Sequence, residues 1–212
     1  MKKRFIPLIY VVVFMPLFVV GVLFVLINAG YMGFMPQFED LENPKSNIAS
    51  QVMSEDNALL GSYFIENRTY ATFDELSPHL VTALLATEDY RFEKHAGVDA
   101  VALMRVVVGL ATGSNKGGGS TITQQLAKNL FPRDTSEYDN FVGRAFHMGL
   151  VKFKEWVTAV KLERNYTKKE IMVMYLNTVA FGGNAFGIRA ASGTFFKKSP
   201  IPLKAEEAAV LV

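Results

Sequence analysis

The chain has 212 residues, half of them hydrophobic, and a formal net charge of +2. This length suits one domain with appendages, and the apolar content allows a sizeable buried core. The near-neutral charge provides no basic field of the kind that binds nucleic acid, and the absence of cysteine excludes disulfide frameworks, thiolate nucleophiles and cysteine-based zinc sites.

The first residues predict a membrane anchor. Lys2, Lys3 and Arg4 precede residues 5–27, which contain no charged residue. A helix of this length spans roughly 34 Å, and a bilayer hydrocarbon core is about 30 Å thick. The basic residues on the short side predict a cytoplasmic N-terminus, with the remainder of the chain outside. A cleaved signal peptide is the alternative, although its apolar segment is usually shorter.

The remaining residues predict a mainly α-helical domain after a polar linker. Residues 59–65 and 69–73 resemble two short strands of a hairpin, and Ser77-Pro78 is typical of a helix start. The chain stops inside an apolar helical pattern at residues 204–212, so we expect a fragment of a longer protein. The predicted segments are a cytoplasmic tail (1–4), a transmembrane anchor (5–29), a juxtamembrane linker (30–57) and the domain (58–212).

Further helices are predicted by their caps and periodicity. Thr121 with Gln124, and Thr167 with Glu170, have the spacing of capping boxes. The longest amphipathic pattern covers residues 141–164. Its expected buried stripe consists of Phe146, Leu150, Phe153, Val157 and Val160.

Two segments carry unusual polar residues. Residues 88–99 (EDYRFEKHAGVD) place Glu88 and Asp89 at a predicted helix C-terminus, where acids oppose the helix dipole, so either a function or a solvated surface acid explains them. Residues 117–129 (GGGSTITQQLAKN) place glycines before a helix N-terminus, an arrangement that can bind phosphate. Lys128 would add charge there, although a flexible loop before an ordinary capped helix fits equally.

Two more segments complete the set. Lys152 and Glu155 are i, i+3 neighbours, which by themselves predict only a surface ion pair worth a few tenths of a kcal/mol. Residues 168–177 (KKEIMVMYLN) end in polar residues where a helix should be most apolar. The three histidines are too scattered for a metal site, and neither a P-loop nor a G-x-S-x-G motif is present.

In this order the four segments closely resemble the motifs of the family 51 glycosyltransferases. These are the glycosyltransferase domains of class A penicillin-binding proteins and the monofunctional peptidoglycan glycosyltransferases. The resemblance runs from about residue 59 to the end, and it implies a lysozyme-like, mainly α fold behind a single transmembrane helix. It also implies an inverting transfer that polymerises lipid-linked disaccharide-peptide (lipid II) and releases polyprenyl pyrophosphate, at the outer face of the bacterial cytoplasmic membrane.

The resemblance assigns roles by position. The catalytic base falls on Glu88 and a second essential carboxylate on Glu155. A sugar hydroxyl is a poor nucleophile and needs such a base; the neighbouring charge of Asp89 would favour proton uptake. Lys128 and Lys152 would neutralise the pyrophosphate. Substrate-binding positions are Asp89, Phe92, Ser120, Thr121, Gln124, Gln125, Lys128, Asn129 and Lys152.

No cofactor is required by the sequence, but the leaving pyrophosphate leaves room for a divalent cation, Mg or Mn. Expected partners are the lipid-linked precursor, the membrane and a transpeptidase domain or partner. Val151 replaces a family arginine, Arg189 stands where many members have glutamate, and Lys197 where glycine is common. Two alternatives therefore stay open, an inactive anchored scaffold that binds precursor and a lysozyme-like lytic enzyme.

Overall fold

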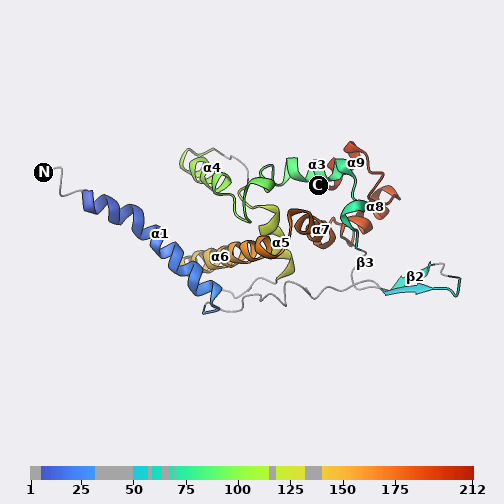
Figure 1. Cartoon of the computed structure of the whole chain (residues 1–212), viewed down its shortest axis with the longest axis horizontal. Helices are drawn as coiled ribbons and strands as arrows, with labels where there is room; N and C mark the ends of the chain where they lie inside the picture. The colour runs from blue at the N-terminus through green and yellow to red at the C-terminus, as the bar shows by residue number, and fades with distance from the viewer. Residues whose placement is uncertain are drawn as a thin grey trace.

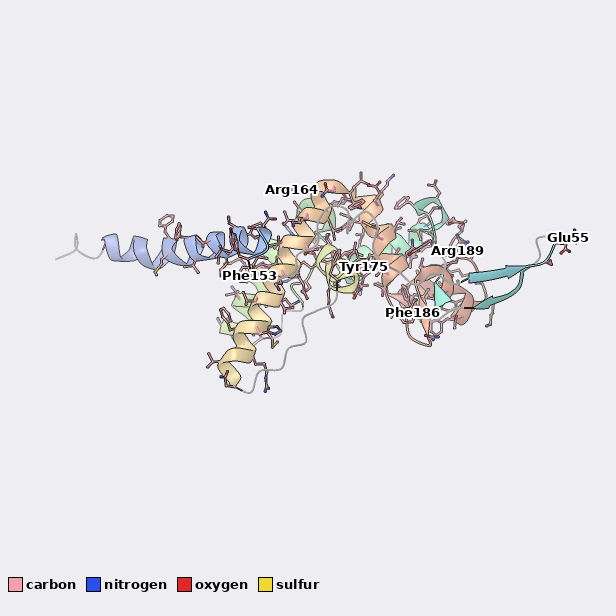
Figure 2. The ribbon with its side chains drawn as sticks, turned by 90° about the horizontal axis from the view of Figure 1, so that it is seen from below. Glu55, Phe153, Arg164, Tyr175, Phe186 and Arg189 are labelled. Carbon is pink, nitrogen blue, oxygen red and sulfur yellow. The ribbon has the colours of Figure 1, made fainter. Side chains whose placement is uncertain are left out.

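The computed structural model describes residues 6–31, 50–56, 59–63, 67–68, 70–114, 118–131 and 140–212. This part of the chain is mainly helical, as predicted. Figure 1 shows a central helical body, with α1 and the β1–β2 ribbon extending from opposite sides of it, and Figure 2 agrees. The helices are α1 (Ile6–Asn28), α3 (Pro78–Thr87), α4 (Ala100–Ala111), α5 (Ile122–Leu130), α6 (Phe141–Asn165), α7 (Lys168–Thr178), α8 (Ile188–Phe196) and α9 (Ala205–Leu211).

The strands pair differently from the predicted hairpin. Strand β1 (Ser50–Met53), inside the expected linker, runs antiparallel to β2 (Leu59–Tyr63). Strand β3 (Asn67–Arg68) instead pairs in parallel with β4 (Ala185–Phe186), far along the chain. The predicted second strand at 69–73 is wrong over its described residues, since 70–72 carry no strand and a 3₁₀ helix, η2, begins at Phe73 (Phe73–Glu75). Short strands take partners from tertiary packing, which a local pattern does not reveal.

The predicted helix starts are confirmed. The Ser77 hydroxyl accepts a hydrogen bond from the backbone N–H of His79 at the start of α3 (3.2 Å). Capping boxes at Thr121 and Thr167 open α5 and α7. These starts depend on residues within one turn of each other, so local sequence suffices to locate them.

The predicted buried stripe of α6 holds only in its second half. Val157 is fully buried against Ile27 at the end of α1, and Leu150 and Phe153 pack beside them, with Phe153 labelled in Figure 2. Phe146 is 63% exposed, so that part of the prediction is wrong. Helices α1 and α5 are the main neighbours of α6, and the buried residues of α6 begin at Glu155.

The main core joins α3, α5, α7, α8 and α9, with Leu80, Leu84, Ile122, Leu126 and Ile171 among its fully buried side chains. Helix α5 packs against α6 and α7, and hydrogen bonds from Ile122 to Asp89 and from Gln125 to Glu88 join it to the C-terminal end of α3. Among the residues that the structure describes, no helix combines the length and hydropathy needed to cross a membrane, and the predicted anchor is not confirmed.

Candidate active site

Glu88 is the C-terminal cap of α3 and is half-buried. Its Oε2 accepts a hydrogen bond of 2.6 Å from Nε2 of Gln125, on α5. The Gln125 Oε1 in turn accepts a bond of 3.1 Å from the hydroxyl of Tyr175, on α7. Three helices thus meet at one carboxylate.

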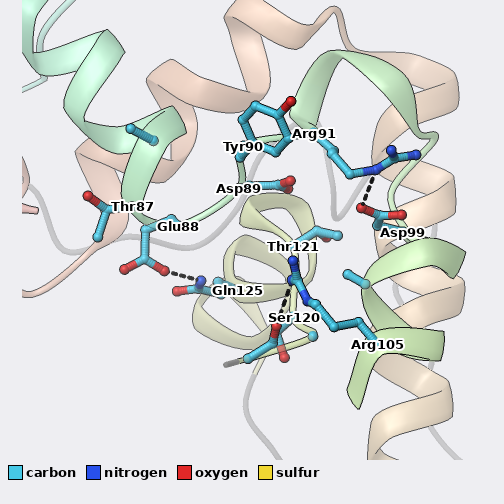
Figure 3. Close-up of a pocket in the computed structure, with 14 residues that line it drawn as sticks. Thr87, Glu88, Asp89, Tyr90, Arg91, Asp99, Arg105, Ser120, Thr121 and Gln125 are labelled. Atoms are coloured by element: carbon cyan, nitrogen blue, oxygen red, sulfur yellow. Dashed lines mark hydrogen bonds and ion pairs between the residues drawn. The ribbon is translucent and has the colours of Figure 1, made fainter. Parts of the chain in front are cut away.

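Glu88 lines a pocket of about 420 Å³ (Figure 3). The residues after α3 form one wall, and α4 with residues 118–121 forms the other. The predicted site residues that line it are Glu88, Asp89, Ser120, Thr121 and Gln125. The fold therefore brings Glu88 and Ser120 to one cavity. Glu88 is thus a pocket residue and not an acid on an open surface.

Asp89 is buried and has a different task from its neighbour. Its carboxylate contacts Nε2 of His95 at 3.0 and 3.1 Å and accepts the backbone N–H of Ile122 at 3.1 Å. Ile122 is the first residue of α5, where a negative charge is favourable. Through this hydrogen bond Asp89 holds the segment after Glu88 against the start of α5.

Thr121 and Gln124 also serve the scaffold. The Thr121 hydroxyl donates to the backbone oxygen of Gly97 (2.6 Å) and accepts the N–H of Gln124 (3.2 Å). Gln124 is 2% exposed, and its side-chain oxygen accepts a hydrogen bond from the backbone N–H of Thr121. Gly97 has φ +91°, and a Cβ there would lie 2.8 Å from the carbonyl carbon of Ala159, so only glycine lets this loop approach α6 so closely.

The remaining predicted residues do not line the pocket. Phe92 is 1% exposed in the main core, with the Lys168 ammonium 4.2 Å from its ring centre. Lys128 and Asn129 lie exposed on α5. Lys152 forms a 2.8 Å ion pair with the buried Glu155 on α6. Whether these residues reach substrate stays a prediction.

Two cations that the sequence reasoning missed do line the pocket, Arg91 and Arg105. The Arg91 Nε donates to Asp99 at 2.9 Å, and Arg105 reaches from α4 to the backbone oxygen of Gly118 at 3.5 Å (Figure 3). Asp99, the N-cap of α4, and Ala102 and Arg105 on that helix share one face by their spacing of three, but the spacing does not indicate that this face lies opposite Glu88.

The Asp99 carboxylate is held in its charged form. Burial opposes the charge, but the backbone N–H groups of Ala102 and Val101 and the Arg91 guanidinium outweigh it and lower the pKa of Asp99. Within the described residues no three histidine or acidic side chains are grouped as metal ligands. The divalent cation that the sequence leaves open stays a prediction.

Comparison with known proteins adds independent findings. A family model described as Transglycosylase matches residues 56–212. The chain is 36% identical over 203 residues to penicillin-binding protein 1A of Aquifex aeolicus (strain VF5), covering 91% of this chain and 26% of that protein. It is 34% identical over 211 residues to penicillin-binding protein 1F of Bacillus subtilis (strain 168), covering 99% and 27%. Identity to penicillin-binding protein 1A of Escherichia coli (strain K12) is 35% over 204 residues, covering 91% and 22%. The chain thus spans about a quarter of the length of these relatives.

Proposed function

This chain belongs to the transglycosylase family, the family 51 glycosyltransferases, and on that premise we propose that its helical body polymerises lipid II into peptidoglycan glycan strands. The observation that carries the proposal is Glu88, a carboxylate that lines a polar pocket and accepts a short hydrogen bond from an amide. A carboxylate held as an acceptor is prepared to take a proton.

In the proposed step, Glu88 removes the proton of the 4-hydroxyl of the incoming disaccharide. The freed oxygen attacks C1 of the terminal sugar of the growing chain, and a new O4–C1 bond forms. The bond from C1 to the diphosphate oxygen breaks with inversion, and polyprenyl pyrophosphate leaves with the electron pair. General-base catalysis of this kind contributes about 10²- to 10⁴-fold to a rate.

The leaving diphosphate needs positive charge. Lys128 and Lys152 are the proposed sources, and Arg105 joins them because its guanidinium lines the pocket that holds Glu88. Glu155 is the proposed partner for the positive charge that develops on the donor sugar. Its pairing with Lys152 places a carboxylate and a cation together, as that step requires.

We also propose that the body works at the outer face of the cytoplasmic membrane, behind an N-terminal anchor. The uncharged residues 5–27 and the basic residues before them support this orientation. Helices α4 and α6 lie at the α1 end of the body (Figure 1), and the exposed apolar side chains that they carry suit a lipid surface. They are Val101, Met104, Val107, Val108 and Leu110 on α4, and Phe141, Val142, Phe146 and Met148 on α6.

The relatives are named penicillin-binding proteins, and this chain covers about a quarter of each. We therefore propose that a penicillin-binding transpeptidase, in the same polypeptide or a partner, uses the glycan strands that this part makes.

The test is incubation of the detergent-solubilised protein with lipid-linked disaccharide pentapeptide. The unchanged protein should make polymer, and Glu88→Gln should lose at least about 10²-fold of the rate. Glu93→Gln is the matched control, because Glu93 is exposed and outside the pocket, and it should keep full activity. Soluble muropeptides from intact sacculi would support a lytic enzyme instead, and binding without turnover would support a scaffold.

A further inference from the structure

Gln125 has an ambiguous side chain, because an amide presents a donor at one end and an acceptor at the other. Its Nε2 faces Glu88 at 2.6 Å, and its Oε1 faces the Tyr175 hydroxyl at 3.1 Å. If the amide were reversed, its oxygen would face the carboxylate of Glu88, and the two acceptors would repel. The charged carboxylate thus favours the orientation seen here, and a donor placed at the oxygen end of the amide would strengthen that preference.

The Tyr175 hydroxyl is suited to that task. Tyr175 is 6% exposed on α7, which packs directly on α5. Burial, followed by the negative charge of Glu88, raises the pKa of Tyr175 to about 12, so the phenol keeps its proton. A phenol that keeps its proton donates it, and the acceptor within reach is the Gln125 oxygen.

Other titratable groups line the pocket with Glu88, and two of the acids among them already have partners. On the pocket side, Asp89 is bound by His95 and the start of α5, and Asp99 is paired with Arg91. Arg105 and Tyr90 are the further titratable groups in that lining.

On its other side Glu88 lines a second cavity of about 270 Å³, between α3, α7 and α9. Tyr175 is the one other titratable side chain in that lining, whose remaining members are Leu84, Leu176, Val179, Ala180, Phe181, Leu211 and Val212. Tyr175 therefore lies on a largely apolar side of Glu88. In such surroundings the hydrogen bond from its hydroxyl to Gln125 is worth more than it would be in water.

We propose that Tyr175 is a positioning residue, which orients Gln125 so that its N–H group holds Glu88 as a proton-accepting carboxylate. The proposal rests on the proposed role of Glu88 as the base. Tyr175 acts only through Gln125, so its effect requires the amide at position 125.

Tyr175→Phe removes the hydroxyl and keeps the ring. We expect kcat to fall about three- to tenfold with KM unchanged, since one hydrogen bond in the base assembly is lost. The acidic limb of the pH–rate profile should move to higher pH, because Gln125 can then turn its oxygen toward Glu88 and favour the protonated acid. Tyr31→Phe is the matched control, since Tyr31 is 81% exposed at the end of α1, and its profile should match the unchanged protein.

The decisive measurement repeats Tyr175→Phe in a Gln125→Met background. The single Gln125→Met change should shift the acidic limb in the same direction, and adding Tyr175→Phe should change nothing further. Equal effects of Tyr175→Phe in both backgrounds, or a loss of rate with an unmoved acidic limb, would overturn the proposal.

A second readout is independent of turnover. The ¹³C carboxyl resonance that disappears in Glu88→Gln should titrate at higher pH in Tyr175→Phe than in the unchanged protein, and an unshifted titration also overturns the proposal. If the unchanged protein makes no polymer, the proposed function fails. The titration of Glu88 still tests whether Tyr175 acts on it through Gln125. If polymer forms, Glu88→Gln abolishes it and Tyr175→Phe behaves as the unchanged protein, only the role of Tyr175 fails.

Discussion

At the scale of single residues, two adjacent carboxylates have opposite surroundings. Glu88 is half-buried at a pocket, whereas Asp89 is 7% exposed and bound by His95 and by the first N–H of α5. Glu88 is the C-terminal cap of α3, and Asp89 begins the segment that leads through η3 (Phe92–Lys94) to α4. Glu88 therefore faces the pocket, as its proposed role as the base requires, whereas Asp89 holds the fold together.

This division predicts different responses to the loss of each charge. Asp89→Asn replaces a carboxylate acceptor by an amide that can accept fewer bonds, and it leaves a buried His95 contact weakened. We expect it to reduce the free energy of unfolding by about 1–3 kcal/mol, and Glu88→Gln to change it by less than about 0.5 kcal/mol. Urea unfolding of both variants measures this, and equal destabilisation would contradict the assignment.

At the scale of elements, the ion pair between Arg189 of α8 and Glu75 of η2 explains one departure from the family pattern. Arg189 stands where many members have glutamate, and here its guanidinium meets a carboxylate. The same Glu75 oxygen accepts the N–H of Thr72 at 2.8 Å, so it also caps η2. Two segments that are distant in sequence are joined by one acid.

This pair predicts a pH dependence of stability. The Arg189 hydrogen bond, followed by the Thr72 backbone N–H, lowers the pKa of Glu75 from 4.5 to about 2. A lowered pKa contributes stability that is present above pH 4.5 and is lost as the pH falls toward about 2. Glu75→Gln should therefore unfold at lower urea than the unchanged protein at neutral pH, and the difference should shrink across that range.

The control for this prediction is Glu93→Gln, an exposed acid on η3 (Phe92–Lys94). Its unfolding midpoint should follow that of the unchanged protein at every pH. If the lower urea midpoint of Glu75→Gln persists at the acidic end of the pH range, packing and not the charge of Glu75 joins η2 to α8.

The elements differ in how far sequence predicts them. The starts of α3, α5 and α7 were predicted correctly, because the caps Ser77, Thr121 and Thr167 bind backbone groups within one helical turn. The pairing of β3 with β4 was missed because it depends on how α8 packs against the start of the domain. The exposure of Phe146 was missed because an amphipathic stripe shows which face could be buried but not how far a neighbouring helix extends.

At the scale of the whole molecule, the same limit applies to the site. Glu88, Ser120 and Gln125, which the sequence motifs assign to one site, line one pocket, and their roles in that site stay a prediction. The motifs could not assign Thr121 and Asp89 to the scaffold, because only the packed fold brings Gly97 to Thr121 and the start of α5 to Asp89. Arg105 was missed for a related reason, since only the packed fold places α4 opposite Glu88.

The polar end of the motif at residues 168–177 also has a meaning only in the whole fold. Asn177, 6% exposed at the end of α7, accepts the backbone N–H of Ala71 and donates to its carbonyl, both at 2.8 Å. One side chain thus satisfies both backbone groups of a buried residue 106 positions earlier in the chain. Gly187 lies against it, since a Cβ there would be 2.9 Å from the backbone oxygen of Asn177.

Asn177→Ala should consequently remove the two hydrogen bonds that hold the backbone of Ala71 against α7. It leaves a buried N–H and a buried C=O of Ala71 without their partner, and each such loss costs about 1–3 kcal/mol, so we expect a total of about 2–5 kcal/mol in urea unfolding. Asn165→Ala is the matched control, because Asn165 is exposed at the end of α6 and its amide donates to the backbone oxygen of Lys161, and the change should cost less than about 0.5 kcal/mol. Hydrogen exchange at the Ala71 amide should accelerate in Asn177→Ala alone; unchanged exchange there would mean that water or a shifted backbone replaces the asparagine, and that the motif ends in a polar residue for some other reason.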